Sequence, residues 1–262
     1  MQSFWHALEI PLIGVAPENK EDLNSSDDLV IELNDAVALL DNFPALSGMG
    51  FQLRLGEIVH LKGPNGAGKS TLLSLCAGLL PIHSGSGMVL GNDLTNQTDR
   101  RRIRRLTGLL SHESSLYDEL SVYANIKFWC SANKVDHEVI DPVMDRLGLS
   151  GRLRNLKVSA LSSGQRRRTS LAVIVCRRPR IWLLDEPYSG LDDAGQKLVD
   201  VLVTNAVSFG ATVMFTSHDS KRAQDLATRT VEMQGGRLKR TPVVHEPIIS
   251  KSTRPIRSEE SA

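Results

Sequence analysis

The chain has 262 residues, and its 31 basic and 30 acidic side chains leave a net charge of +1. This length allows one large domain or two smaller ones. The balanced charge gives no global reason to expect nucleic acid or an anionic surface as the main partner. The longest apolar run, Leu171 to Cys176, is much shorter than the ~20 residues that cross a bilayer. Three widely spaced cysteines indicate neither a disulfide framework nor a zinc site.

The two ends of the chain differ in composition from the middle. Residues 1–28 join a short apolar stretch to a polar, acidic one without a basic segment in front, so we expect a flexible extension and no cleaved signal peptide. A translation start placed too early and a weak membrane-surface anchor are the alternatives. Residues 241–262 carry three prolines and mixed charge, which predicts a mobile tail.

Residues 29–240 alternate short apolar runs with helical periodicity, which predicts a single α/β domain. Such alternation is typical of a parallel sheet covered on both faces, and the long helical stretch in the middle indicates an insertion into that sheet. The expected strands are 29–39, 51–55, 58–61, 107–111, 181–184 and 212–216; the expected helices are 68–80, 198–208 and a helical subdomain at about 112–160.

A phosphate-binding loop is predicted at residues 63–70, whose sequence GPNGAGKS fits GxxxxGK[ST]. The loop follows a predicted strand and opens a predicted helix. Its glycines let successive backbone N–H groups turn toward phosphate oxygens, and the helix N-terminus adds a positive field. Lys69 can reach the β- and γ-phosphates, and the Ser70 hydroxyl can bind Mg²⁺. The residues expected to hold the nucleotide here are Gly63, Pro64, Asn65, Gly66, Ala67, Gly68, Lys69, Ser70 and Thr71.

Two adjacent carboxylates, Asp185 and Glu186, follow the apolar run Ile181–Leu184. Carboxylates at the end of a buried strand are costly unless they hold a cation or a proton. Asp185 therefore fits a Mg²⁺ ligand, and Glu186 fits a group that polarises a water aimed at the γ-phosphate.

A third motif, LSSGQ at residues 161–165, opens a helix whose first turns carry Arg166, Arg167 and Arg168. A serine and a glycine at a helix start expose N–H groups and a hydroxyl that suit an anion. Alone, this motif is better explained as a helix N-cap followed by a solvated basic turn.

In order and spacing these motifs, with Ser189–Asp192 and Thr216–His218, resemble the ATPase domains of ABC transporters over roughly residues 29–240. The resemblance implies an ABC cassette that hydrolyses ATP with Mg²⁺: a mainly parallel core sheet, an antiparallel β edge and an inserted helical subdomain. It also implies a head-to-tail dimer of two copies, in which one copy's phosphate loop faces the other's LSSGQ motif. The nucleotide contacts implied across that interface are Ser162, Ser163, Gly164 and Gln165.

The resemblance assigns further roles and meets two departures. His218 is implied to sense the γ-phosphate, and Asp192 to lie in a loop between the two sites. The glycine usual in the third motif is Ser163 here, a small residue compatible with closure. The usual glutamine after the strand 107–111 is replaced by His112, which can still hydrogen-bond a water or a Mg²⁺ ligand; a surface histidine with no role is the alternative. Phe43 is the nearest aromatic for stacking on adenine, with its register slightly off.

Within the family, the chain is similar to the ATP-binding subunits of haem exporters used in cytochrome c maturation, through His112, the LSxGQ variant and the arginines that follow it. We therefore expect a peripheral subunit on the cytoplasmic face of the membrane that powers a separate permease. Efflux of a drug, lipid or other small molecule is the alternative. A nucleic-acid ATPase is disfavoured, because no coiled coil separates Ser70 from Leu161 and one cassette is present.

Five arginines crowd residues 100–105. A solvated helix face is the simplest interpretation. Docking to anionic lipid or to an acidic loop of a membrane subunit is the second. RNA binding is the third, although no aromatic side chains interleave with the arginines to stack on bases.

Overall fold

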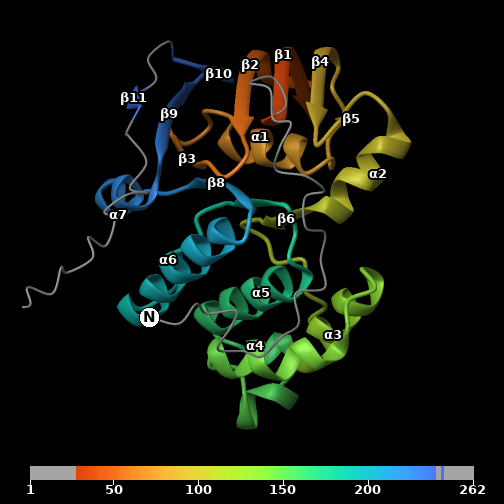
Figure 1. Ribbon diagram of the computed structural model, residues 1–262, viewed down its shortest axis with the longest axis vertical. Coiled ribbons are helices and arrows are strands. Elements are labelled where there is room, and N and C mark those ends of the chain that lie inside the picture. Colours follow the sequence, from red (N-terminus) through yellow and green to blue (C-terminus); the bar gives the residue numbers. More distant parts are fainter. Residues whose placement is uncertain (1–27, 240–242, 245–262) are drawn as a thin grey trace, which may run out of the picture.

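The computed structural model describes residues 28–239 and 243–244. The predicted extension (1–28) and tail (241–262) lie almost entirely outside these described residues. The described chain forms two sheets and a set of helices arranged in layers, with the antiparallel sheet at one end and the helices α3 (Val122–Ala132) and α4 (Ile140–Arg146) at the other (Figure 1).

The antiparallel sheet has the strand order β2-β1-β4-β5. Strand β1 (Leu29–Leu40) confirms the strand predicted at 29–39. The strand predicted at 51–55 is only the end of the much longer β2 (Phe43–Arg54). The first half of β2 buries only Leu46, so no apolar alternation marks it in the sequence. The strands of this sheet are β1 (Leu29–Leu40), β2 (Phe43–Arg54), β4 (Ser84–Val89) and β5 (Asn92–Asp93).

The second sheet has the order β10-β9-β3-β8-β7-β6, and its central pairs are all parallel, as expected. Its strand β9 was not predicted, although its buried Val231 and Met233 alternate with polar side chains as in a half-buried strand. The short strands β10 and β11 add antiparallel pairs to β9. The strands are β3 (Ile58–Lys62), β6 (Thr107–Leu110), β7 (Ile181–Leu184), β8 (Thr212–Thr216), β9 (Arg229–Gln234), β10 (Arg237–Leu238) and β11 (Val243–Val244).

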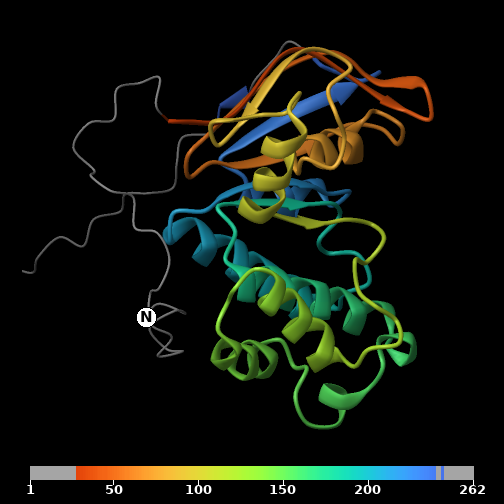
Figure 2. The ribbon, with the colours of Figure 1, turned by 90° about the vertical axis from the view of Figure 1, so that its right-hand side faces the viewer.

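Helices cover both faces of the parallel sheet, with α1 on the side of the antiparallel sheet and α5 and α6 on the other (Figures 1 and 2). The α-helices are α1 (Lys69–Cys76), α2 (Gln97–Leu106), α3 (Val122–Ala132), α4 (Ile140–Arg146), α5 (Ser163–Arg177), α6 (Asp193–Ser208) and α7 (Ser220–Leu226). Short 3-10 turns at His137–Val139, Gly151–Asn155 and Val158–Ala160 complete the region between β6 and α5.

Alternation along the central strands divides the interior into two apolar cores. In β7, Ile181 and Leu183 join the core beneath the antiparallel sheet, whereas Trp182 and Leu184 join the core with α3 to α6. All four side chains are buried, because a parallel strand inside such a sheet is covered on both faces. This continuous burial explains why the strand appears in the sequence as an unbroken apolar run.

Helix boundaries differ from the predictions where capping residues decide them. The helix predicted at 68–80 ends at Cys76, since Gly78 adopts a left-handed φ of +70°. The helix predicted at 198–208 begins earlier, at Asp193, because the Asp192 side chain accepts a hydrogen bond from the Gly195 N–H and caps it.

Candidate active site

The phosphate loop lies between β3 and α1, where the backbone is pressed against the end of β9. A Cβ atom on Gly63 would sit 2.3 Å from the Met233 carbonyl oxygen, so only glycine fits there. Gly68, in the left-handed region with φ of +96°, forms the N-cap of α1 without a side-chain hydrogen bond. The N–H groups of the first turn are therefore available to an anion, as at other phosphate-binding helix starts.

Lys69 folds back over this loop. Its Nζ donates hydrogen bonds to the carbonyl oxygens of Gly63, at 2.8 Å, and Pro64, at 3.1 Å. The Lys69 ammonium group is thus held over the loop, where it can bind phosphate oxygens in place of these two carbonyl oxygens. Ser70, the next residue, has an exposed side chain.

The segment after β8 faces the same loop. A cavity of about 200 Å³ is lined by Gly63 and Pro64 on one side and by Ser217 and His218 on the other. The structure therefore brings together the first and last of the sequence-predicted motifs.

The two carboxylates behave differently although they are neighbours. Asp185 is 7% exposed, and its Oδ1 accepts a hydrogen bond of 2.7 Å from the Thr216 hydroxyl. Glu186 turns out of the strand with a left-handed φ of +49°, a rare conformation for a residue other than glycine.

Glu186 and His218 form a pair. The Glu186 Oε2 accepts a hydrogen bond of 3.2 Å from the His218 backbone N–H, and Oε1 lies 3.6 Å from the His218 Nε2. Glu186 Oε1 is a buried oxygen with no hydrogen-bond partner among the described residues. An oxygen of this kind is ready to accept a hydrogen bond from a water molecule.

Arg167 secures the backbone beneath these carboxylates. Its guanidinium donates to the carbonyl oxygens of Ser111, Asp185 and Glu186 at 2.9, 3.2 and 2.8 Å. Burial lowers the pKa of Arg167, and the nearby charges of Asp185 and Glu186 oppose that shift. The sequence suggested a solvated basic turn here, which is wrong for Arg167. No motif spacing distinguished it from its neighbours, because its partners come from distant segments.

The LSSGQ segment begins α5 with a reciprocal cap. The Ser162 Oγ accepts from the Gln165 N–H at 3.3 Å, and Gln165 Oε1 accepts from the Ser162 N–H at 3.0 Å. The Gln165 side chain is therefore turned back onto its own helix. Gly164 packs so closely on the loop before α6 that a Cβ atom would lie 2.6 Å from the Gly190 carbonyl oxygen.

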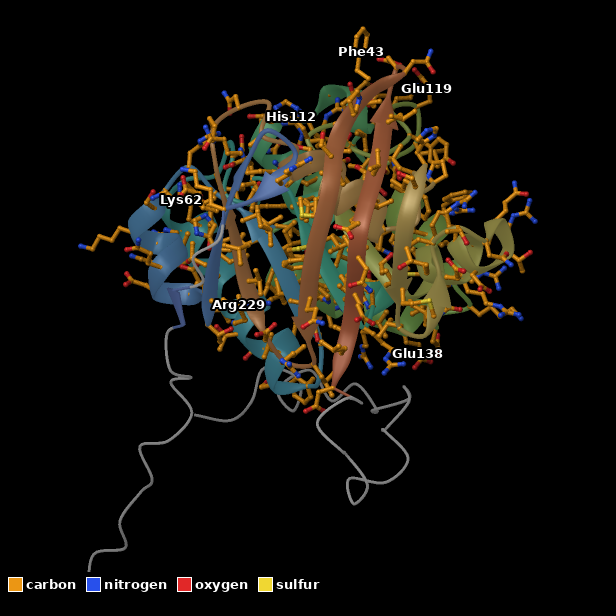
Figure 3. All side chains as sticks on the ribbon, turned by 90° about the horizontal axis from the view of Figure 1, so that it is seen from above. Phe43, Lys62, His112, Glu119, Glu138 and Arg229 are labelled. Atoms are coloured by element: carbon orange, nitrogen blue, oxygen red, sulfur yellow. The ribbon has the colours of Figure 1, made fainter. Side chains whose placement is uncertain are left out.

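Three further residues singled out by the sequence are exposed. His112 follows β6 with an exposed side chain. Phe43 is 75% exposed and projects from the end of the β1–β2 hairpin (Figure 3). Asp192 caps α6 and forms an ion pair of 3.0 Å with Arg168, which links the loop before α6 to the LSSGQ helix.

Two broader properties concern the part of the chain that the structure describes. It holds no group of three or more histidine, cysteine or carboxylate side chains placed to bind a metal ion. None of its helices has the length and apolar character needed to cross a membrane.

A glycine-rich loop at a helix N-terminus, a loop lysine and paired carboxylates at the end of a buried strand of the same sheet define the class: a P-loop ATPase. The family profile described as "ABC transporter" matches residues 46–189, more than half of the chain. The chain belongs to the ABC transporter family and is an ATP-binding, ATP-hydrolysing cassette of that family.

Several relatives carry names from cytochrome c assembly. The cytochrome c biogenesis ATP-binding export protein CcmA of Paramagnetospirillum magneticum is 37% identical over 179 residues, covering 66% of this chain and 81% of that protein. CcmA of Mesorhizobium japonicum is 36% identical over 172 residues, covering 66% and 83%. The uncharacterized ABC transporter ATP-binding protein YdbJ of Bacillus subtilis is 34% identical over 186 residues, covering 70% of this chain but only 59% of that protein.

Solved structures agree on the fold. The dimeric bacterial ABC transporter cassette MJ0796 superimposes with a TM-score of 0.76 at 22% identity, covering 83% of this chain and 100% of that one. The cbiO1 protein from Clostridium perfringens gives a TM-score of 0.68 at 25% identity, covering 81% and 87%. The expected α/β cassette, with its mainly parallel sheet and antiparallel edge, is thereby confirmed.

Proposed function

We propose that the chain is the energy-providing subunit of a transporter, and that it hydrolyses Mg²⁺·ATP between two copies of itself. The observation that carries this proposal is the unpartnered Glu186 Oε1, held 3.6 Å from the His218 ring beside the phosphate loop. A carboxylate so placed can orient a water and take its proton as the water attacks the γ-phosphate.

The residues present fit a magnesium ion. Ser70 supplies a hydroxyl oxygen and Asp185 a carboxylate oxygen, and hard oxygen ligands of this kind suit Mg²⁺. The ion would supply charge neutralisation on the phosphates. The chain's own residues do the rest: the loop N–H groups and Lys69 bind and orient the phosphates, while His218 offers a ring nitrogen near the expected γ-phosphate.

A complete site requires a second copy. The phosphate loop opens α1, whose buried residues belong to the core beneath the antiparallel sheet, whereas the LSSGQ segment opens α5 in the other core. Within one copy, Ser162 and Gln165 bond to each other and Gly164 packs on Gly190, so the polar contacts of this segment among the described residues do not include the phosphate loop. A head-to-tail pair would bring one copy's loop to the other's Ser162, Ser163 and Gly164.

Glu186→Gln tests the mechanism. Turnover should fall by ~10²-fold or more, the effect of losing a general base, and an ATP-bound dimer should accumulate in size-exclusion chromatography. Glu119→Gln is the matched control, because Glu119 is 83% exposed and pairs with Lys157, away from the phosphate loop. Hydrolysis by Glu186→Gln at the parent rate would remove Glu186 from the mechanism.

The permease is proposed to dock in a groove of about 510 Å³ between α2, β6 and the helices α3 and α5. We call it the arginine groove, because Arg101, Arg104, Arg105 and Arg177 line it. The Trp129 Nε1 and Arg177 Nε, both in lining residues, are buried donors without a hydrogen-bond partner among the described residues. A peptide segment that brings an acidic side chain and apolar neighbours would satisfy them.

Haem export for cytochrome c assembly is the proposed cargo function, supported by the relatives named CcmA. It places the subunit at the cytoplasmic face of the membrane. Efflux of another small molecule is the second candidate, since the relative YdbJ has no assigned substrate. Haem staining of c-type cytochromes in a deletion strain separates the two: haem export predicts loss of the stained bands, and other cargoes predict normal bands.

A further inference from the structure

Thr216, the last residue of β8, has a hydroxyl that the proposed mechanism does not use. The residue is 0% exposed and pairs with Leu61 of β3. On the other side of β8, Leu184 of β7 pairs with Phe215, so the next position along brings Asp185 opposite Thr216. A buried hydroxyl at this place requires partners.

The Thr216 Oγ1 has two partners, and both belong to the carboxylate motif. It donates to Asp185 Oδ1 at 2.7 Å and accepts from the Glu186 N–H at 2.8 Å. One hydroxyl can do both, because it has one proton and two lone pairs. A single atom therefore sets the orientation of the Asp185 carboxylate and the position of the next peptide group.

That peptide group needs support. Glu186 has a φ of +49°, and a non-glycine residue keeps such a conformation only where its surroundings fix it. Arg167 holds the carbonyl oxygens of Asp185 and Glu186, and Thr216 holds the N–H between them. The turn brings the Glu186 carboxylate within 3.2 Å of the His218 N–H.

We propose that Thr216 is a positioning residue, which aims the Asp185 carboxylate at the magnesium ion and keeps the Glu186 turn in place for hydrolysis. The inference rests on the proposed function of these two carboxylates. Loss of the Thr216 hydroxyl should therefore weaken the effect of Mg²⁺ on ATP binding and lower kcat, and should leave the binding of metal-free ATP unchanged.

Three variants test it. Thr216→Val keeps the shape and removes the hydroxyl, and Thr216→Ser keeps the hydroxyl. Thr212→Val is the matched control: Thr212 is equally buried at the other end of β8, about 13 Å away at ~3.3 Å per residue, and its hydroxyl accepts the Gly56 N–H at 3.0 Å. Both valine variants lose a buried hydroxyl that serves a backbone N–H, so a general loss of stability affects both.

Two measurements are needed: kcat with Mg²⁺, and the ratio of the ATP dissociation constants without and with Mg²⁺, from a fluorescent ATP analogue. Thr216→Val should lose about 10–100-fold in kcat and in that ratio, the range for partners that orient metal ligands. Thr216→Ser and Thr212→Val should stay close to the parent. If Thr216→Val does not fold, Thr216→Ala gives the same comparison.

The outcomes separate the two proposals. A parent chain that hydrolyses Mg²⁺·ATP, with Thr216→Val matching Thr212→Val in both measurements, overturns the role of Thr216 alone. That role is also overturned if Thr216→Ser is as impaired as Thr216→Val, because the hydroxyl is then not what matters. A parent chain without Mg²⁺-dependent hydrolysis overturns the proposed function and this inference with it.

Discussion

Single buried polar side chains tie the strand ends of the site together, and His60 is a clear case. It lies in the middle of β3 with 1% exposure, and its Nε2 is 3.3 Å from the Ser217 carbonyl oxygen, immediately before His218. Its ring stacks on Phe215 at 5.3 Å between centroids. No local pattern predicts this contact, because His60 and Ser217 are 157 residues apart.

Protonation of His60 should destabilise the fold. Burial, the largest cause, lowers the pKa of His60 below 6.5, and the charges of Lys62 and Lys69 lower it further, against the opposing hydrogen bond to Ser217. At pH values between the lowered pKa of His60 in the folded chain and its ordinary pKa in the unfolded chain, the unfolded chain binds more protons. The contribution of neutral His60 to the free energy of unfolding is therefore fully present above about pH 6.5. It falls as the pH drops below that value, by at most ~1.4 kcal/mol per pH unit.

Urea unfolding at pH 7.5, 6.5 and 5.5 checks this prediction in the parent and in His60→Gln, which keeps an N–H donor for Ser217 and cannot titrate. The free energy of unfolding should fall less steeply toward pH 5.5 in the variant. His137→Gln, on the exposed surface beside Ser131, is the control and should follow the parent. Parallel pH profiles for parent and His60→Gln would refute the assignment.

Elements with strong local signals could be predicted from the sequence, and the others could not. The apolar runs of β7 and β8 and the glycine loop before α1 depend on neighbours in the chain. The first half of β2 buries only Leu46 and is held as a strand by its hairpin pairing with β1, whereas β9 pairs with β3 from the other end of the domain. The same division holds in the site: the motif residues, Arg167 and Thr216 among them, could be named in advance, but the contacts of these two could not, because their partners come from other elements.

Helix α2 carries its arginines on more than one face, and this allows a controlled test of the arginine groove. Arg101 and Arg105 line the groove and form no hydrogen bond or ion pair with a described residue. Arg102 is 66% exposed, pairs with Asp99 at 3.2 Å and does not line the groove. The predicted helix face is confirmed for these residues, and only some of its arginines are free to bind.

Arg101→Glu combined with Arg105→Glu should reduce co-sedimentation of the chain with membranes that contain its permease, because two cations that would meet an acidic segment become anions. Basal ATPase activity should be unchanged, since neither residue lies in the nucleotide site. Arg102→Glu, on the same helix, should sediment like the parent. Equal sedimentation of all three proteins would move the docking site elsewhere.

At the scale of the whole molecule, the proposed head-to-tail dimer makes one nucleotide site from the phosphate loop of one copy and the LSSGQ segment of the other. Assembly of the site and dimerisation are therefore expected to be one event. Gly164 is a poor position to test this, because any side chain there collides with the Gly190 carbonyl oxygen within one chain. Ser162 is better: it caps α5, and asparagine or aspartate caps a helix equally well.

Ser162→Asp should abolish ATP-driven dimerisation, whereas Ser162→Asn should preserve it. Both variants keep the N-cap of α5, and they differ by one negative charge placed where the partner's γ-phosphate is expected. Two like charges ~4 Å apart at an effective dielectric constant of 20 repel by about 4 kcal/mol, which lowers the dimer constant roughly a thousandfold for each of the two sites in the dimer. Sedimentation velocity in the Glu186→Gln background, with and without Mg²⁺·ATP, measures the dimer constant of each variant.

Binding of a fluorescent ATP analogue to the monomer should be the same in both variants, because the phosphate loop is untouched. Dimerisation of Ser162→Asp at parent strength would exclude the head-to-tail arrangement.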